Sequence, residues 1–507
     1  MTELLCGKIS SREMRRAATC LAWAVCFAAI AVSGCWAFAE QSSPAQEESS
    51  HHKELSVRDF GAAGDGIRDD TDAVQSAVDR GGAILFPAGR YRLTRTVNVD
   101  LAQTGWVSLS GRGVARIIME GPGPAFRFVG THTGTADPNS VKPDVWEQQR
   151  MPLVDGLEIV GNHEEACGLE AVRTMQWTVT RTTIRSTLHA LRLFERNRNV
   201  VLSDCHFYDN RGCGVLLEDV DLHQINVIGC HISYNRGGGV VVRGGYLRNL
   251  QISGCDIEFN MGADSPPTAN VLIDSVQSII GHAEIAIVGC TIQHSVRAPD
   301  SANIRFIGRD STGRYWGNLT IADNVLSDVT RNIEIIAARG VSITGNTFWG
   351  AAEEDLFVVD SENVLVGPNV FDQNPNYNRE GNYRGGVGMH RSRGCTLQGL
   401  HLADILGPAI TLEECDGVNV TGCTVRGSRG PGVQLLDVRR GRVSDCLLEI
   451  GVSRSADGTA PPALRVQGGS HLMIRGNMTD GETEVSPDSS EVSLADNVRI
   501  PPREAGR

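Results

Sequence analysis

The amino-acid sequence predicts an all-β solenoid, a parallel β-helix, on two observations. First, a short pattern recurs from Leu157 to Val498: apolar, any residue, apolar, two residues, then Asn or Cys, one residue, apolar. Second, its polar positions mostly follow each other at steps of 20 to 25 residues, with longer steps of 31 to 35. Short apolar segments with such a period form solenoids in which each repeat buries its inner face on its neighbours. The polar position is filled by Cys205, Cys230, Cys255, Cys290, Asn324, Asn346, Asn369, Cys423, Cys446, Asn477 and Asn497.

The polar position has a physical explanation in stacked rungs. Neighbouring rungs lie about 4.8 Å apart, so Asn side chains at equivalent positions can hydrogen-bond along the axis. Cys fills the same small space as a compact hydrophobe. A second column, Asn210, Asn235 and Asn260, recurs five residues after the first. Because Asn tolerates the left-handed backbone that corners need, we expect both columns to lie at corners in that conformation.

The cysteines predict buried free thiols. The chain has 14 cysteines, of which ten follow residue 39, and six of these ten fill the polar position. Equivalent side chains on stacked rungs point in parallel and not toward each other, which disfavours disulfides. Along the sequence, no group of His and Cys has the spacing of a metal site, so we expect no metal centre.

Residues 1–39 have the pattern of a signal peptide. Three arginines precede an apolar run over 20–32 that is too short to span a bilayer comfortably, and 37–39 offer a small-residue cleavage site. We therefore expect export, to the medium, the periplasm or the cell envelope. Alternatively, Cys35 ends a stretch that resembles a bacterial lipobox and would carry a lipid anchor. Residues 40–53 form a polar linker with no apolar period.

Composition excludes two kinds of function. The formal net charge is −13, from 47 basic and 60 acidic residues, which argues against nucleic-acid binding. The only lysines are Lys8, Lys53 and Lys142, and none lies in the repeats. A lysine base in the solenoid is therefore excluded.

Residues 55–96 carry the most specific local pattern. A Gly-rich turn is followed by a helix that begins near Thr71, and a buried strand follows over 83–86. A helix at this place would cover the open first rung, whose unpaired edge would otherwise recruit other strands. Asp69, Asp70 and Asp72 look catalytic in isolation, but we expect them to be loop and cap residues.

The run DFGAAGDGIRDDTDAVQSA, which begins at Asp59, resembles the N-terminal segment of the pectate-lyase-like superfamily of rhamnogalacturonase/epimerase type. The resemblance implies a right-handed parallel β-helix with the pectin-lyase-like fold, in a single domain over 54–500 with a short tail over 501–507. Within that domain, 54–100 would be the capping segment and 157–498 the regular rungs. The resemblance also implies a carbohydrate context, since members include polysaccharide lyases, glycoside hydrolases, epimerases and phage tailspikes.

The resemblance further implies that the strand after the long corner of each rung lines the substrate groove. Period-two alternation with Val215 and Leu217 inside turns Leu216 and Glu218 outward. Carried along the repeats, this register gives two outward columns. One column holds Glu218, Arg243, Asp274, Ile307, Ile336, Val359, His390, Glu413 and Leu436. The other holds Glu170, Arg192, Arg305, Glu334, Thr411, Gln434 and Arg465.

Glu218, Arg243 and Asp274 are the predicted catalytic residues. Carboxylates two rungs apart would lie roughly 9 to 10 Å from each other, near the upper end of the separation that an inverting glycosidase needs. An Arg between them would hold one carboxylate ionised. Alternatively, Arg243 resembles the arginine that serves as base in some β-helix lyases, with acidic neighbours that bind calcium; hydrolysis would require no cofactor. Without catalysis, the three residues would form a surface charge ladder.

A second group is predicted to bind substrate. It consists of Arg305, Glu334, His390 and Glu413, with Tyr377 and Tyr383 from the corner over 372–386. A His beside a carboxylate could also act as a general base. We expect a polysaccharide hydrolase or lyase, and the alternative is a non-catalytic carbohydrate-binding or cell-envelope protein. The characteristic residue sets of polygalacturonases and of alginate epimerases are absent from the sequence.

Overall fold

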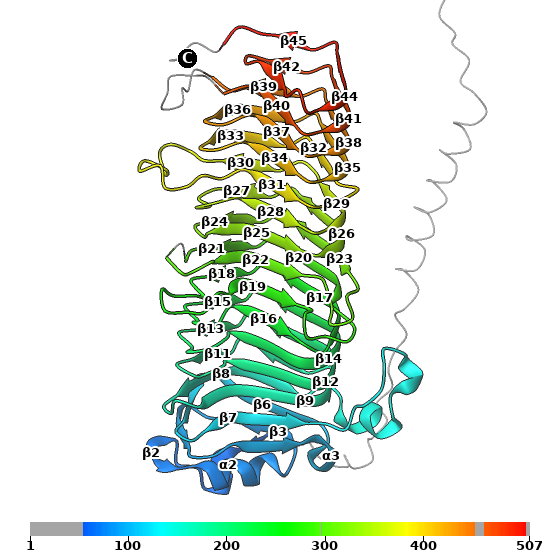
Figure 1. The fold of residues 1–507 in the computed structure, drawn as a ribbon. Helices are drawn as coiled ribbons and strands as arrows, with labels where there is room; N and C mark the ends of the chain where they lie inside the picture. Colours follow the sequence, from blue (N-terminus) through cyan, green and yellow to red (C-terminus); the bar gives the residue numbers. More distant parts are fainter. Residues whose placement is uncertain (1–53, 296, 452–460, 503–507) are drawn as a thin grey trace, which may run out of the picture. The chain divides into compact units, whose positions relative to one another are not determined.

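The computed structural model describes residues 54–295, 297–451 and 461–502. Across this part of the chain, parallel strands wind into a right-handed β-helix, and a typical turn of the winding, or rung, gives one strand to each of three faces (Figure 1). The predicted fold class is therefore confirmed. The predicted signal peptide, the linker, the alternative lipid site at Cys35 and most of the predicted tail lie outside the described residues. None of the described helices is long and apolar enough to cross a bilayer.

Face 1 contains the strands that follow the long corners. In order along the axis these are β5 (Val97–Asp100), β7 (Gly123–Val129), β9 (Ala166–Met175), β12 (Leu191–Ser203), β14 (Val215–Ile228), β16 (Val240–Arg243), β19 (Ala269–Asp274), β22 (Ala302–Ile307), β25 (Arg331–Ile336), β28 (Leu356–Val359), β31 (Val387–His390), β34 (Ile410–Glu413), β37 (Val433–Leu436), β40 (Leu464–Gln467) and β43 (Thr483–Val485).

Face 2 begins at the first residues of the solenoid and also takes the second halves of β12 and β14. Its other strands are β1 (Leu55–Ser56), β3 (Gly82–Leu85), β6 (Val107–Met119), β8 (Leu153–Gly161), β10 (Thr178–Thr180), β17 (Tyr246–Ser253), β20 (Ala283–Val288), β23 (Trp316–Ala322), β26 (Ala338–Thr344), β29 (Glu362–Val366), β32 (Thr396–Gln398), β35 (Asp416–Thr421), β38 (Arg439–Ser444), β41 (Ser470–Arg475) and β44 (Ser490–Ala495).

Face 3 is built mostly from short strands and takes the second halves of β6 and β8. Its other strands are β2 (Asp65–Asp69), β4 (Gly89–Leu93), β11 (Thr183–Arg185), β13 (His206–Tyr208), β15 (His231–Ser233), β18 (Asp256–Glu258), β21 (Thr291–Gln293), β24 (Val325–Ser327), β27 (Thr347–Phe348), β30 (Val370–Asp372), β33 (His401–Ile405), β36 (Thr424–Ser428), β39 (Leu447–Glu449), β42 (Met478–Thr479) and β45 (Val498–Arg499).

The predicted ladder at the corner between faces 2 and 3 is present. Asn324 donates from Nδ2 to Oδ1 of Asn346 at 3.0 Å, and Asn346 donates in the same way to Asn369 at 3.0 Å. In the cysteine part of the column, the backbone N of Cys230 lies 3.4 Å from Sγ of Cys255. All ten cysteines of the described residues are buried and free, which confirms the prediction for the six at the polar position.

At many ladder positions, the left-handed corner conformation belongs to the preceding residue. Asp323, with φ 56°, precedes Asn324, and Tyr234, with φ 55°, precedes Asn235. The prediction that the ladder Asn residues themselves adopt this conformation is therefore wrong. The preceding residue makes the turn, which leaves the Asn side chain directed inward to hydrogen-bond along the axis.

A second ladder runs along the corner between faces 3 and 1 and is longer than the predicted column. Each amide Nδ2 donates to the side-chain oxygen of the next member at 2.7 to 2.9 Å. The members are Asn210, Asn235, Asn260, Asn270, Asn303, Asn332 and finally Asp355. Buried amides joined in this way satisfy each other without water, which stabilises the corner.

The helix α2 (Thr71–Val78) covers the first rung, as predicted (Figure 1). Val74, Ala77 and Val78 are fully buried. Gln75 donates from Nε2 to the backbone O of Asn98 at 2.8 Å and accepts from its backbone N at 2.9 Å, so it satisfies the open edge of β5.

The remaining short elements lie before α2 and in the first turns. They are the 3-10 helix η1 (Val57–Phe60), the helix α3 (Leu101–Thr104), the 3-10 helix η2 (Pro138–Ser140) and the π-helical turn η3 (Val145–Gln149). Asp70 precedes α2 and accepts from the backbone N atoms of Ala63 and Gly64 at 2.6 and 3.1 Å. Asp69 accepts from the backbone N of Thr71 at 3.0 Å, which agrees with the expected structural role of these carboxylates.

Candidate functional site

Both predicted outward columns are present on face 1. The strand register pairs Glu218 with Arg243 and Arg243 with Asp274, and continues through His390 and Glu413. Inward positions such as Val215 and Leu217 are fully buried. The alternation predicted from the sequence is therefore confirmed, and it places the charged residues of face 1 in two clusters along the axis.

The first cluster contains the predicted catalytic residues. Arg192 donates from Nη2 to Oε2 of Glu218 at 2.7 Å. Asp274 accepts through Oδ1 from the backbone N of Val276 at 2.9 Å. Arg243 lies between them in the register and is exposed, and its guanidinium makes no hydrogen bond or ion pair to any described residue. The cluster thus combines two carboxylates that are held in place with one guanidinium that is free to reach a bound molecule.

A charge ladder does exist on this face, but it lies on the N-terminal side of Arg243. Arg127 pairs with Glu170 at 2.9 Å, Glu170 with Arg192 at 3.5 Å, and Arg192 with Glu218 at 2.7 Å. Opposite charges on neighbouring rungs stabilise the stacking. The charge ladder that was the non-catalytic alternative therefore includes Glu170, Arg192 and Glu218, and it does not extend to Arg243.

Two neutral histidines adjoin this cluster, and the column argument found neither of them. Burial lowers the pKa of His189, Arg192 lowers it further, and the carboxylates of Glu218 and Glu170 oppose the change. Its Nδ1 accepts from the backbone N of Cys213 at 3.1 Å, so the neutral ring carries its proton on Nε2.

The second histidine, His282, lies beneath the loop that follows Asp274. Burial lowers its pKa to about 4. Its Nε2 lies 3.1 Å from the backbone O of Asp274. Since the ring stays neutral near pH 7, it can hold this loop by hydrogen bonding without adding a charge to the cluster. Both histidines lie on corners, where strand alternation makes no prediction.

The centre of face 1 beside this cluster is covered. Leu216, Val241 and Leu272 point outward but are at most 5% exposed. They form a small apolar cluster with Cys213, Ala269 and Ala302. A substrate at the first cluster would therefore contact the column that contains Arg243, and not the apolar centre of the face.

The second cluster is centred on a buried ion pair. Arg305 donates from Nε to Oε2 of Glu334 and from Nη2 to the backbone O of Asp300 at 2.9 Å. Arg305 and Glu334 are each only 6% exposed. They were assigned to substrate binding by the register, but burial and mutual pairing leave them little surface for a sugar. The structure gives them a structural role instead.

Arg331 lies above this pair and was not found from the sequence. Its guanidinium contacts the carboxylates of Asp300, Glu334, Glu353 and Glu354. Burial alone would lower the pKa of Arg331, but the neighbouring glutamates Glu353, Glu354 and Glu334 outweigh it, and the pKa is raised. Because Glu353 and Glu354 come from the corner before β28, no periodic pattern marks them.

His390 and Glu413 form the outer part of the second cluster. His390 Nδ1 lies 2.9 Å from Oε2 of Glu413. The imidazole packs on Phe357 with the ring centroids 5.0 Å apart. The guanidinium of Arg331 also lies over the ring of Phe357, 4.8 Å from its centroid. The carboxylate of Glu413 orients the imidazole, and the pair is partly exposed. His390 therefore has the geometry of a general base.

The long corner over 372–386 packs toward face 3. Tyr377 packs on Trp349 with the centroids 5.1 Å apart. Burial and the Asp328 carboxylate, which is hydrogen-bonded to Tyr383, raise the pKa of that tyrosine. The two tyrosines predicted to bind sugar therefore contact residues that directly follow β24 and β27 on face 3, whereas His390 lies on face 1.

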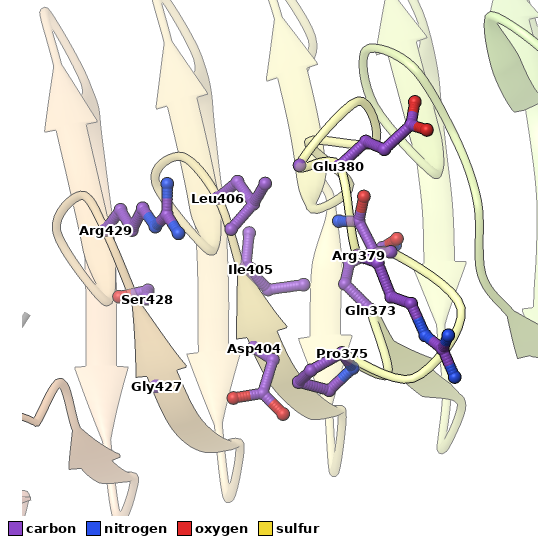
Figure 2. Close-up of a pocket in the computed structure, with 12 residues that line it drawn as sticks. Gln373, Pro375, Arg379, Glu380, Asp404, Ile405, Leu406, Gly427, Ser428 and Arg429 are labelled. Carbon is purple, nitrogen blue, oxygen red and sulfur yellow. The ribbon is translucent and has the colours of Figure 1, made fainter.

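The same corner forms one wall of a pocket of about 380 Å³ over β33 and β36 (Figure 2). Figure 2 shows Arg429 pointing across the pocket toward Leu406, with Asp404 beside Pro375. The full lining is Gln373, Pro375, Asn378, Arg379, Glu380, Gly381, Asp404, Ile405, Leu406, Gly427, Ser428 and Arg429. The pocket has a mostly polar lining and is separate from both clusters on face 1.

The winding, the three faces and the N-terminal helix define a solenoid protein of the right-handed β-helix class. The family description "Right handed beta helix region" matches residues 150–292 and 278–437, which together cover more than half of the chain. The description "Rhamnogalacturonase A/epimerase, pectate lyase-like" matches residues 55–151. The chain therefore belongs to the right-handed β-helix family, in the pectate-lyase-like superfamily.

Similar proteins share short segments or the fold. Mannuronan C5-epimerase AlgE2 of Azotobacter vinelandii is 48% identical over 132 residues, which cover 21% of this chain and 13% of the epimerase. A probable glucan endo-1,3-beta-glucosidase of Arthroderma benhamiae is 38% identical over 92 residues, which cover 17% of this chain and 10% of that protein. The matches thus span a small part of these curated relatives.

A solved phage structure shares the fold over most of the chain. The tailspike protein gp49 of Pseudomonas phage LKA1 aligns with a TM-score of 0.52 and 13% identity, and the alignment covers 82% of this chain and 83% of the tailspike. At this identity the likeness shows a shared β-helix fold.

Proposed function

We propose that this chain is an exported, carbohydrate-active protein that cleaves a polysaccharide bound along face 1, by hydrolysis or by β-elimination. The observation that carries the proposal is the position of Arg243, an exposed and unpaired guanidinium between Glu218 and Asp274 on successive rungs. The epimerase and the glucosidase among its relatives, by their names, act on polysaccharides, which supports this class of substrate.

Each reaction assigns different roles to the same three residues. In hydrolysis, Glu218 and Asp274 would supply the acid and the base on opposite sides of the scissile bond, and Arg243 would bind the sugar between them. In β-elimination, Arg243 would take the proton next to a uronate carboxylate, and the two acidic side chains would hold calcium against that carboxylate.

His390 and Glu413 extend the same face toward the C-terminus. Their 2.9 Å contact orients the imidazole, and their partial exposure allows contact with a second part of the polysaccharide. We propose that they bind substrate at a distance from the cleaved bond.

Product release from acidic and neutral polysaccharides, followed by reducing ends and by absorbance of unsaturated sugars, tests the proposal. We expect the Glu218→Gln variant to lose at least about 100-fold in rate, as expected for loss of a general acid or base. Glu195→Gln is the matched control, because Glu195 forms an Arg–Glu pair of the same length, 2.7 Å, with a similarly exposed side chain.

The type of product separates the two reactions. Reducing ends without unsaturated sugars would indicate hydrolysis, whereas unsaturated sugars that disappear in the Arg243→Ala variant would indicate elimination. If the wild-type protein binds polysaccharides but releases no product from any of them, cleavage is refuted and the chain is a carbohydrate-binding protein.

A further inference from the structure

Three polar side chains on face 3 converge from two neighbouring rungs. His231 lies on β15, and Asp256 and Glu258 lie on β18. The register pairs His231 directly with Asp256. Since Glu258 is two residues after Asp256 in the same strand, both carboxylates leave the same surface of the sheet as the imidazole.

The distances within this group differ from those of ordinary His–carboxylate pairs. His231 Nε2 lies 3.8 Å from Oδ2 of Asp256 and 3.8 Å from Oε1 of Glu258. One potential ligand atom from each residue lies within 4.8 Å of the others. By contrast, His390 and His471 each approach their glutamate to 2.9 Å, a hydrogen-bond distance.

These separations suit an ion held between the three side chains. Nitrogen and oxygen ligands bind zinc at about 2.0 to 2.2 Å, so atoms that share one ion lie about 3 to 4 Å from each other. A hydrogen-bonded imidazole would instead move to within about 3 Å of one carboxylate. The nearly equal distances from His231 to both acids therefore favour a shared ion over a simple pair.

Two atoms of the group also lack any other partner. His231 Nε2 and Asp256 Oδ1 are buried atoms without a hydrogen bond to any described residue. Unpaired buried polar atoms destabilise a fold unless a ligand satisfies them, and a cation bound here would satisfy both atoms.

A neighbouring side chain orients the group. Gln293 donates from Nε2 to Oε2 of Glu258 at 3.2 Å, which leaves Oε1 of Glu258 directed to His231. Hydrogen bonds of this kind commonly fix the carboxylates that bind metals.

We propose that His231, Asp256 and Glu258 bind a divalent first-row transition metal ion, with zinc as the probe that tests the site. One imidazole and two carboxylates match this class of ion, whereas calcium prefers oxygen ligands only. The site is independent of the function proposed for face 1. Spacing along the sequence predicted no metal centre because these ligands lie 25 and 27 positions apart and are joined only by stacking of the rungs.

Titration of the metal-free full chain with zinc chloride, followed by calorimetry, tests the site. We expect one equivalent of zinc to bind, with affinity at least about tenfold lower in His231→Ala and in Asp256→Asn. His471→Ala is the control, because it removes an exposed histidine that lies near a carboxylate. Circular dichroism of each variant establishes that it is folded before titration.

Three outcomes would overturn the proposal: no saturable zinc binding by the wild-type chain, unchanged affinity in both folded site variants, or equal loss in His471→Ala. Saturable binding of calcium in place of zinc would overturn the assignment to a transition metal. Cobalt bound at the same stoichiometry, with absorption bands typical of nitrogen and oxygen ligands, would support it.

Discussion

Replacing Asp355 by Asn should change how the stability of the protein depends on pH. Asp355 is fully buried at the end of the second Asn ladder. It accepts from Nδ2 of Asn332 at 2.9 Å, from Nε2 of Gln373 at 2.8 Å and from the backbone N of Gly386 at 3.0 Å. Gln373 and Gly386 begin and end the corner over 372–386, so this one carboxylate holds both ends of the pocket wall.

Burial raises the pKa of Asp355 to about 7, because it outweighs the three hydrogen bonds that favour the ionised form. Below pH 7 the folded protein thus holds a proton that the unfolded chain has released above about pH 4. Stability from this group is fully present below pH 4 and is lost as the pH rises through 7. The whole loss is roughly 4 kcal/mol at about 1.4 kcal/mol per pKa unit, and about 3 kcal/mol of it falls between pH 5 and pH 8.

Urea denaturation of the wild-type and Asp355→Asn proteins at pH 5 and pH 8 measures this effect. The free energy of unfolding of the wild type, relative to the variant, should fall by about 3 kcal/mol between the two pH values. A difference that stays constant would refute the reasoning, and so would one that rises.

Asp310→Asn is the control for this experiment. Asp310 is also buried, and burial alone would raise its pKa, but hydrogen bonds from Thr312, Trp316 and Arg314 outweigh burial and hold the pKa well below its usual range. Its stabilising contribution is present above the usual Asp pKa and is lost only as the pH falls below it. The difference between the wild type and Asp310→Asn should therefore be nearly constant from pH 5 to pH 8.

Two further predictions concern the interior. Asn235→Ala should lower the free energy of unfolding by about 3 to 5 kcal/mol, because in the core it removes an acceptor of Asn210 Nδ2 and a donor to the Phe207 carbonyl, while Asn98→Ala, at an exposed side chain of β5, should cost less than about 1 kcal/mol; equal urea midpoints for the two variants would contradict this. In a chain without residues 1–39, Ellman's reagent should label none of the ten cysteines until the protein is denatured, because all ten are buried; rapid labelling of several thiols under native conditions would show that the rungs open.

The outward columns of face 1 could be predicted because they depend on local geometry. Alternation puts every second residue on the same side of a strand, and the parallel register repeats that choice on each rung. Glu218, Arg243 and Asp274 were therefore correctly aligned from the sequence alone. The polar ladder was predictable for the same reason, since one position per rung always meets its equivalent on the next.

Exposure could not be predicted in the same way. Arg305 and Glu334 have the outward register of Arg192, which stays partly exposed, yet corner residues and mutual pairing bury Arg305 and Glu334. Arg331 and its partners in the corner before β28 had no periodic signal. Corners of unequal length do not obey the repeat, so their contacts follow only from the folded chain.

By itself, the sequence determined that this protein is a parallel β-helix with a capped first rung, buried thiols and a line of charges on one face. These properties arise from two regular repeats in the sequence: the alternation of every second residue along a strand, and the recurrence of equivalent positions from one rung to the next. Only the tertiary structure decided that Arg243 is unpaired, that Asp355 holds the wall of a pocket, and that His231 meets Asp256 and Glu258. Those relations depend on side-chain rotamers and on residues from different rungs. Only the stacking of the rungs brings these residues within reach of each other.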